Sequence, residues 1–261
     1  MLRTRIDIVL THFPECFHPF LMDCPVYDSS CSPEARVWLL DRDGGIYLKR
    51  AAKGSLETEA SMTRFFHNKG LGAEVLAYEQ QEQDWLLTRR VAGEDCTFRQ
   101  YLDDPKRLSD LLGNLLRRLH EVDTAGCPIP DRTKTYLQTA SENYRNRRFD
   151  TSLFPDNWGY ASAEDAWCVV QEMGPHLRSD TLLHGDYCLP NIMLDNWKFS
   201  GFIDLGNGGV GDRHIDLFWG LWSLNFNLKS NAWSDRFLDA YGRDRIDWQI
   251  LRSIGAFEVF G

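Results

Sequence analysis

The sequence predicts an α+β fold with two lobes, a small lobe built on an antiparallel β-sheet with one main helix and a larger, mostly helical lobe. Two observations predict this division. Strand-like runs separated by turn residues fill the part before Gly93, whereas apolar residues recur at steps of three and four after it. We therefore expect a first domain over residues 1–90 and a second domain over residues 91–261.

The first lobe is expected to open with a β-hairpin. Asp-Gly-Gly at 43–45 stands between two apolar runs and is a strong hairpin signal. A helical stretch follows and ends toward Gly70, and two further strand-like runs flank the polar turn 79–84. The expected elements are, in order, strands over 36–40 and 46–49, a helix over 56–68, and strands over 74–78 and 85–88.

The second lobe begins with a helix on which leucines at 108, 111, 112, 115, 116 and 119 form one apolar face. Ser162 followed by Asp165 resembles a capping box, and the helix that it starts is stopped by Gly174-Pro175. The other expected elements are strands over 192–194 and 199–203, and helices over 213–226, 232–241 and 247–260.

Composition excludes several classes of protein. The 29 basic and 38 acidic residues give a net charge of −9, which argues against a nucleic-acid binder and suits a cationic ligand. The seven cysteines never occur as C-x-x-C, which indicates reduced thiols in a cytoplasm and no metal cluster. Because no apolar run approaches about 18 residues, we expect no signal peptide and no membrane span. An obligate protein partner is not evident either.

Two neighbouring motifs carry the chemistry: His-Gly-Asp-Tyr-Cys-Leu-Pro-Asn at 184–191 and Gly-Phe-Ile-Asp-Leu-Gly at 201–206. If the strands between them pair as a hairpin, Asn191 and Asp204 lie at the same open end. Their oxygens suit Mg²⁺, which prefers hard oxygen ligands and takes only one or two from a protein. Asp186 is then placed to accept the proton of an attacking hydroxyl, as phosphoryl transfer requires.

Each of these residues alone has a simpler explanation, because Asp and Asn are common in turns. The joint spacing of Asp186, Asn191 and Asp204 is what matches the catalytic Asp, catalytic-loop Asn and metal-binding Asp of kinases. We expect His184 to pack and orient the loop rather than to transfer protons.

A kinase also needs a cation for the nucleotide phosphates, and Lys49 on the second strand is the candidate. Its partner would be a glutamate of the following helix, Glu59, with Glu57 as a rival. Strand alternation places Tyr47 on the same face as Lys49, where its ring could stack on adenine. A glycine-rich phosphate loop is missing from the first hairpin, and Ser-Pro-Glu beginning at Ser32 takes its place.

Together these motifs resemble the aminoglycoside 3'-phosphotransferases, or kanamycin kinases, over most of the chain. The resemblance extends to Asp-Arg-His-Ile-Asp at 212–216. It implies a two-lobed protein-kinase-like fold, with a nucleotide-binding first lobe and a catalytic second lobe that binds the substrate. It also implies ATP and Mg²⁺ as cofactors and the 3'-hydroxyl of a cationic antibiotic such as kanamycin as acceptor, so that the enzyme confers resistance.

The resemblance implies a role for each matching residue. Asp186 would be the general base, Asn191 and Asp204 would hold Mg²⁺, and Asp216 would support the catalytic loop. The nucleotide site would comprise Ser32, Tyr47, Lys49 and Glu59, the linker backbone near Arg89 and Val91, and Ile203 under the adenine.

The sequence departs from the family's pattern at the antibiotic pocket. Of the acid pair near the family's C-terminus only Glu258 is present, in a stretch that ends at Gly261, and these two residues are the candidates there. Asp156 matches a further acidic contact, but Gly159 stands where a second acid is expected, and Asn207 replaces an arginine. Two alternatives stay open: a kinase of a macrolide, choline or a sugar, and a nucleotide-binding module without catalytic activity.

Overall fold

The computed structural model describes residues 4–149 and 160–261. They form two compact units, the first comprising Met1–Gly93 and Met193–Gly206 and the second Glu94–Ile192 and Asn207–Gly261. The first unit is the sheet-based one and the second is mostly helical, so the α+β fold predicted from the sequence is confirmed.

The segment 193–206, which we expected in the second domain, belongs to the first unit. The physical reason lies in strand β10 (Lys198–Phe202). The Phe202 N–H donates a hydrogen bond of 2.7 Å to the Leu71 carbonyl, and the ring of Phe202 packs edge-on against Phe66. These contacts hold the predicted hairpin of β9 (Ile192–Asp195) and β10 to the first unit.

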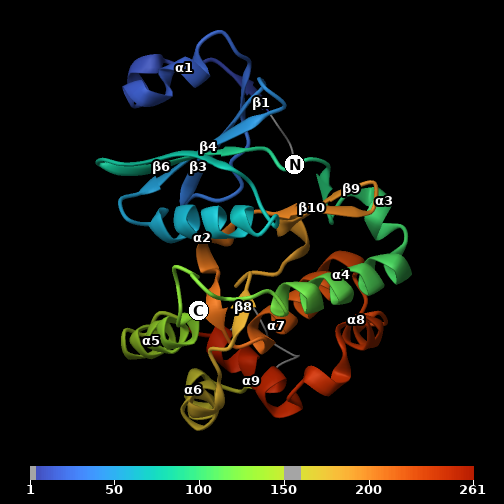
Figure 1. The fold of residues 1–261 in the computed structure, drawn as a ribbon. Coiled ribbons are helices and arrows are strands. Elements are labelled where there is room, and N and C mark those ends of the chain that lie inside the picture. The colour runs from blue at the N-terminus through green and yellow to red at the C-terminus, as the bar shows by residue number, and fades with distance from the viewer. Residues whose placement is uncertain (1–3, 150–159) are drawn as a thin grey trace. The chain divides into compact units, whose positions relative to one another are not determined.

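The first unit contains one six-stranded antiparallel sheet with the order β1-β2-β3-β4-β6-β5 (Figure 1). Its helices and strands are β1 (Thr4–Ile6), α1 (His18–Leu21), β2 (Val26–Asp28), β3 (Ala35–Leu40), β4 (Ile46–Ala52), α2 (Glu57–Asn68), β5 (Val75–Gln80), β6 (Gln83–Arg89), β9 (Ile192–Asp195) and β10. Short 3₁₀ turns at Leu10–His12 and Glu15–Phe17 complete it, and the turn Leu205–Asn207 begins at its last two residues.

Alternation along β4 decides which side chains reach α2. Ile46 and Leu48 point to one apolar cluster of the sheet, whereas Ala51 packs with Leu56 and Ala60 around α2. Since neighbouring residues of a strand face opposite sides, Tyr47 and Lys49 share the α2 side with Ala51. The predicted common face of Tyr47 and Lys49 follows directly from this register.

The prediction that the chain opens with the 36–49 hairpin is wrong, because β1, α1, β2 and two 3₁₀ turns precede it. Phe13 and Phe17 from this opening segment cover the face of the sheet opposite α2. Phe13 packs edge-on against Trp38 at 5.1 Å between ring centroids, and Trp38 stacks on Trp85 at 5.9 Å. The segment gave no periodic signal because its elements are three or four residues long.

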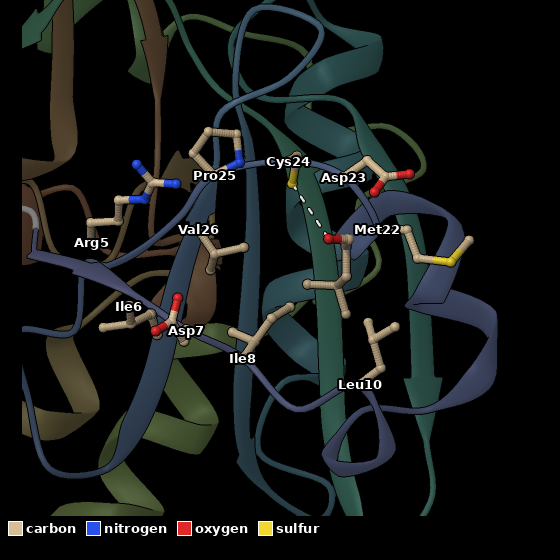
Figure 2. A pocket seen from close by; sticks show the side chains of 11 residues that line it. Arg5, Ile6, Asp7, Ile8, Leu10, Met22, Asp23, Cys24, Pro25 and Val26 are labelled. Carbon is tan, nitrogen blue, oxygen red and sulfur yellow. Dashed lines mark hydrogen bonds between the residues drawn. The ribbon is translucent and has the colours of Figure 1, made fainter.

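The opening segment also borders a cavity of about 630 Å³ (Figure 2). Figure 2 shows Ile6 and Ile8 in the lower part of the view and Asp23, Cys24 and Pro25 in the upper part. The Cys24 thiol donates to the Leu21 carbonyl at 3.7 Å. None of the nucleotide-site candidates is among the residues that line this cavity.

The sequence placed Asp84 in a polar turn over 79–84. In the structure the two flanking strands are longer than predicted. Asp84 is therefore a buried residue of β6, and it pairs with Gln80 of β5. Its carboxylate accepts hydrogen bonds from the backbone N–H of Leu56 and from the hydroxyl of Tyr78, at 2.9 and 3.0 Å. Leu56 is the N-cap residue directly before α2 and has no polar side chain, so Asp84 supplies a hydrogen bond at the start of this helix from another element.

The second unit is built on helices, with α4 packed along α8 and α9 against α6 and α7 (Figure 1). Its helices and strands among the described residues are β7 (Glu94–Asp95), α3 (Arg99–Leu102), α4 (Pro105–His120), α5 (Arg132–Arg145), α6 (Ala163–Met173), β8 (Thr181–Leu183), β11 (Gly209–Gly211), α7 (His214–Leu228), α8 (Ser234–Tyr241) and α9 (Trp248–Glu258). Three 3₁₀ turns, Gly174–His176, Leu189–Asn191 and Arg243–Arg245, lie between them.

The predicted helix of 108–119 is confirmed, and so is Ser162 as the N-cap of the helix that it starts. The Ser162 hydroxyl accepts the Asp165 N–H at 3.1 Å, and α6 ends at Met173, directly before Gly174. Helix α5 was not predicted, although Asp131 caps it by accepting the Lys134 N–H at 3.0 Å.

The seven cysteines are all free, as expected for reduced thiols. Within residues 4–149 and 160–261, no helix combines the length and the apolar character that a membrane crossing requires.

Candidate active site

In the first unit, Lys49 lies between two carboxylates. Its ammonium donates to Glu59 Oε2 at 2.7 Å and to Asp204 Oδ1 at 2.9 Å. Lys49 comes from β4, Glu59 from the first turn of α2, and Asp204 from the segment after β10. Of the two candidate partners on α2, the structure pairs Lys49 with Glu59 rather than with Glu57.

The two carboxylates that bond Lys49 differ in their exposure to solvent. The side chain of Glu59 is 11% exposed and that of Asp204 is 54% exposed. Burial raises the pKa of Glu59 and the nearby Asp204 adds to this, although Lys49 opposes both. Burial alone would lower the pKa of Lys49, but Glu59 and then Asp204 raise it on balance, so the amine stays charged. Asp204 is therefore the carboxylate that is open to a ligand.

The backbone of Asp204 has φ = +60°, in the left-handed region that non-glycine residues rarely adopt. Aspartate tolerates this conformation better than most residues because its short side chain can bond locally. Strained φ/ψ values of this kind cluster at functional sites, where the surrounding structure holds them.

The other nucleotide candidates all lie in the first unit, on different elements. Ser32 is exposed on the segment between β2 and β3, and Arg89, at the end of β6, pairs with Glu74 at 2.6 Å. Val91 is buried and lies against Gly201, where a Cβ would stand 3.0 Å from its Cγ1. Ile203 is half-buried and directly precedes Asp204.

In the second unit, Asp186 and Asn191 are directly bonded. The Asn191 amide nitrogen donates to the Asp186 carbonyl at 3.0 Å and to Asp186 Oδ2 at 2.8 Å. Because the amide nitrogen makes both bonds, the amide oxygen is the atom of Asn191 that can accept a cation. Asn191 is buried, and it therefore fixes the carboxylate of Asp186 in one orientation.

Asp216 anchors the loop that carries Asp186 through hydrogen bonds to its backbone. This fully buried carboxylate accepts the backbone N–H groups of His184 and Gly185 at 2.8 and 2.7 Å, so its expected supporting role is confirmed. His184 is also buried, and its Nδ1 accepts the Asp186 N–H at 3.3 Å, in agreement with an orienting role. Gly185 has φ = +83°, and a Cβ there would collide with the backbone of Asn207.

Asp186 lines a cavity of about 460 Å³ that lies within the second unit. Most of its lining is apolar or aromatic, with a few charged groups. The lining residues are Arg132, Tyr136, Thr139, Leu183, Gly185, Asp186, Cys188, Asn207, Ile215, Trp219, Trp222, Glu258 and Gly261. The two predicted substrate residues Glu258 and Gly261 thus share this cavity with Asp186, whereas Asp156 lies outside the described residues.

Glu258 has an unusual environment. Its Oε1 accepts the hydroxyl of Tyr136 at 2.6 Å and the indole N–H of Trp219 at 3.2 Å. Burial raises the pKa of Glu258 to about 7, and the negative charge of Asp186 contributes, although the two hydrogen bonds and Arg132 act in the opposite direction. The carboxyl group therefore changes charge near neutral pH.

Sequence reasoning missed Arg132, Tyr136 and both tryptophans of this cavity. The Arg132 guanidinium donates to Asn207 Oδ1 at 2.8 Å, so a cation from α5 stands beside the position where the family's pattern has an arginine. Burial lowers the pKa of Arg132, while Glu258 opposes that shift. The cap at Asp131 was the signal that could have placed Arg132 at the start of a helix.

Comparisons with known proteins agree with these motifs. The model of a family described as phosphotransferase enzymes matches residues 29–254. Over 260 residues the chain is 50% identical to the "Probable aminoglycoside 3'-phosphotransferase" of Lactococcus lactis, a match that covers 98% of each chain. It is 30% identical over 170 residues to an aminoglycoside 3'-phosphotransferase of Escherichia coli, which covers 64% of this chain and 62% of that one.

Solved structures share the fold. The crystal structure of an aminoglycoside 3'-phosphotransferase of type VIII superposes with a TM-score of 0.73 at 24% identity and covers 91% of this chain and 94% of that one. An aminoglycoside phosphotransferase from Streptomyces rimosus, in complex with ADP and streptomycin, gives a TM-score of 0.68 at 21% identity and covers 85% and 90%.

Proposed function

The chain belongs to the phosphotransferase enzyme family, and we propose that it transfers the γ-phosphoryl group of ATP to the 3'-hydroxyl of an aminoglycoside antibiotic such as kanamycin, which confers resistance. One observation carries the proposal: Asp186 and Glu258 line the same cavity. A base for a hydroxyl and a second carboxylate for an ammonium group are what an aminoglycoside acceptor needs.

In the proposed reaction, the acceptor hydroxyl donates a hydrogen bond to Asp186, which orients the oxygen and takes its proton as the new P–O bond forms. The bond between the γ-phosphorus and its bridging oxygen breaks at the same time, and ADP leaves with that oxygen. Asn191 keeps the Asp186 carboxylate in place through its 2.8 Å bond. Catalysis then depends on positioning and on neutralising the charge of the transferred group.

Lys49 is proposed to bind the phosphates of ATP, with Glu59 holding the ammonium in position through the 2.7 Å bond. Asp204 and Asn191 are the proposed Mg²⁺ ligands, because the exposed carboxylate of Asp204 in the first unit and the amide oxygen of Asn191 in the second are each hard ligands of the kind that Mg²⁺ prefers. Mg²⁺ held by such ligands would neutralise the negative charge of the ATP phosphates.

The remaining nucleotide contacts are proposed on the same basis. Tyr47 shares the strand face of Lys49, where its ring can stack on adenine, and Val91 and Ile203 offer apolar side chains to the base. The backbone near Arg89 and Val91 is proposed to hydrogen-bond the adenine, and the segment at Ser32 to approach the phosphates. Because the reaction consumes ATP, we propose that it takes place in the cytoplasm.

Glu258 gives a prediction about pH. An aminoglycoside ammonium would be bound by the ionised carboxylate, and Glu258 is mostly ionised only above its pKa of about 7. Lowering the pH from about 8 to about 6 should therefore raise the KM for kanamycin roughly tenfold, since about a tenth of the carboxylates are ionised one unit below the pKa. Steady-state kinetics should show no comparable change in the KM for ATP.

Two variants test the origin of this pH dependence. Glu258→Gln should remove it and leave only the titration of the antibiotic itself. Tyr136→Phe deletes a hydrogen bond that lowers the pKa of Glu258, so the midpoint of the profile should move to higher pH. A midpoint that is the same in all three proteins would show that Glu258 does not bind the ammonium group.

The proposed function is tested by release of ADP from Mg-ATP in the presence of kanamycin or of its 3'-deoxy analogue tobramycin. Turnover with kanamycin and none with tobramycin is the expected result, because tobramycin lacks the acceptor hydroxyl. Turnover of a macrolide, choline or a sugar, with none of any aminoglycoside, would reassign the acceptor to one of those molecules.

A further inference from the structure

Three aromatic side chains follow one face of helix α7. Trp219, Trp222 and Phe226 are spaced three and four residues apart, so they lie one above the other along the helix. Trp222 stands at 80° to Trp219 with 5.5 Å between the ring centroids, and it stacks on Phe226 at 5.1 Å and 9°. We call these three residues the aromatic row.

The aromatic row begins inside the acceptor cavity and ends in solvent. Trp219 and Trp222 both line the cavity that contains Asp186 and Glu258, whereas Phe226 is 55% exposed. The indole N–H of Trp219 is already used by Glu258, which fixes that ring. The two indole rings therefore form a right-angled corner in the cavity wall.

The cavity has few carboxylates for a ligand that carries several positive charges, and the indole corner can bind part of such a ligand. Among the described residues that line the cavity, Asp186 and Glu258 are the acids and Arg132 is a base. An aminoglycoside carries several ammonium groups, and Asp186 is engaged by the acceptor hydroxyl. An indole face attracts a cation without requiring a further buried carboxylate, and it also packs against the C–H groups of a sugar ring.

We propose that Trp222 is a specificity-determining residue that binds an aminosugar ring of the acceptor in the corner that it forms with Trp219. The inference rests on the proposed function and assigns a contact beyond the acidic residues. In this arrangement the ring's C–H groups lie on the indole and an ammonium group points to the π face.

Phe226 acts through Trp222 and is a positioning residue. Its ring stacks almost parallel to the indole, and the ammonium of Lys229 lies 4.0 Å from its centroid. Phe226 thus covers part of one face of Trp222 and supports that ring. Removal of Phe226 should loosen Trp222 without removing the contact itself.

The test uses the full chain and compares KM values for kanamycin and for ATP. Trp222→Leu keeps apolar bulk but loses the ring face, and it should raise the KM for kanamycin about threefold to twentyfold while the KM for ATP stays unchanged. Trp222→Phe keeps a ring and should recover most of the affinity. Phe226→Ala should give a smaller rise than Trp222→Leu.

Phe98→Ala is the matched control, because Phe98 is 49% exposed, belongs to the same unit and does not line the cavity. Its KM for kanamycin should equal that of the unmodified chain. A second readout is the intrinsic tryptophan fluorescence of the folded protein, which kanamycin should change in the unmodified chain and change much less in Trp222→Phe.

The outcomes separate this inference from the proposed function. If the unmodified chain turns over kanamycin and Trp222→Leu has a KM for kanamycin within twofold of it, the role of Trp222 is wrong while the function stands. The same holds if Trp222→Leu is misfolded and the fluorescence response of Trp222→Phe is unchanged. If the unmodified chain turns over no aminoglycoside, the proposed function and this inference both fall.

Discussion

Replacing Asp186 by asparagine is expected to lower kcat by about a hundredfold to ten-thousandfold, the usual loss when a general base is removed. The amide cannot take the proton of the acceptor hydroxyl at neutral pH. Asparagine keeps the size of the side chain and an oxygen that can still accept the hydrogen bond from Asn191. The expected loss is therefore one of chemistry rather than of folding.

The measurement is kcat for kanamycin phosphorylation, together with a thermal melt of each protein. Asp180→Asn is the control, because this acid lies in the same unit, pairs loosely with Arg213 at 3.7 Å and does not line the acceptor cavity. Both variants should melt close to the unmodified chain. An Asp186→Asn protein with a kcat within threefold of normal would remove Asp186 from the role of base.

Asp204→Asn is expected to reduce turnover by roughly a hundredfold to a thousandfold and to raise the Mg²⁺ concentration needed for half-maximal rate. The substitution removes the carboxylate charge that is proposed to hold the metal. Asparagine also tolerates the left-handed backbone at φ = +60°, so the segment after β10 should keep its shape.

Glu59→Gln distinguishes loss of the metal ligand from loss of the lysine's position. Glu59 and Asp204 both accept a hydrogen bond from Lys49, but of these two carboxylates only Asp204 is proposed to bind Mg²⁺. Glu59→Gln should therefore raise the KM for ATP while the Mg²⁺ dependence stays close to normal. If Asp204→Asn retained the normal Mg²⁺ dependence, the ligand would have to be another group.

Local patterns explain what the sequence could predict. Lys49 and Glu59 could be paired because strand alternation sets the side of the sheet on which Lys49 lies, and Glu59 is in the first turn of the next helix. Asp186 and Asn191 could be read from their spacing within one loop. Both pairs are set by the geometry of one or two neighbouring elements, so they can be predicted without knowing how the other elements pack.

The missed features depend on packing. The opening segment with Phe13 and Phe17 covers a sheet face, but elements of three or four residues leave no periodic signal. Helix α7 was predicted, yet it is apolar on nearly every side, so periodicity could not show that Trp219 and Trp222 face a cavity rather than the core. The surroundings of Glu258 likewise combine α5, α7 and α9, which are far apart in the sequence.

The central claim is the position of the transferred phosphate. Kanamycin should be incubated with Mg-ATP and the purified chain, and the product analysed by phosphorus–proton correlation NMR. A single phosphate coupled to the proton at the 3' carbon is the predicted result, whereas a phosphate coupled to any other ring proton, or unmodified kanamycin, would contradict the account.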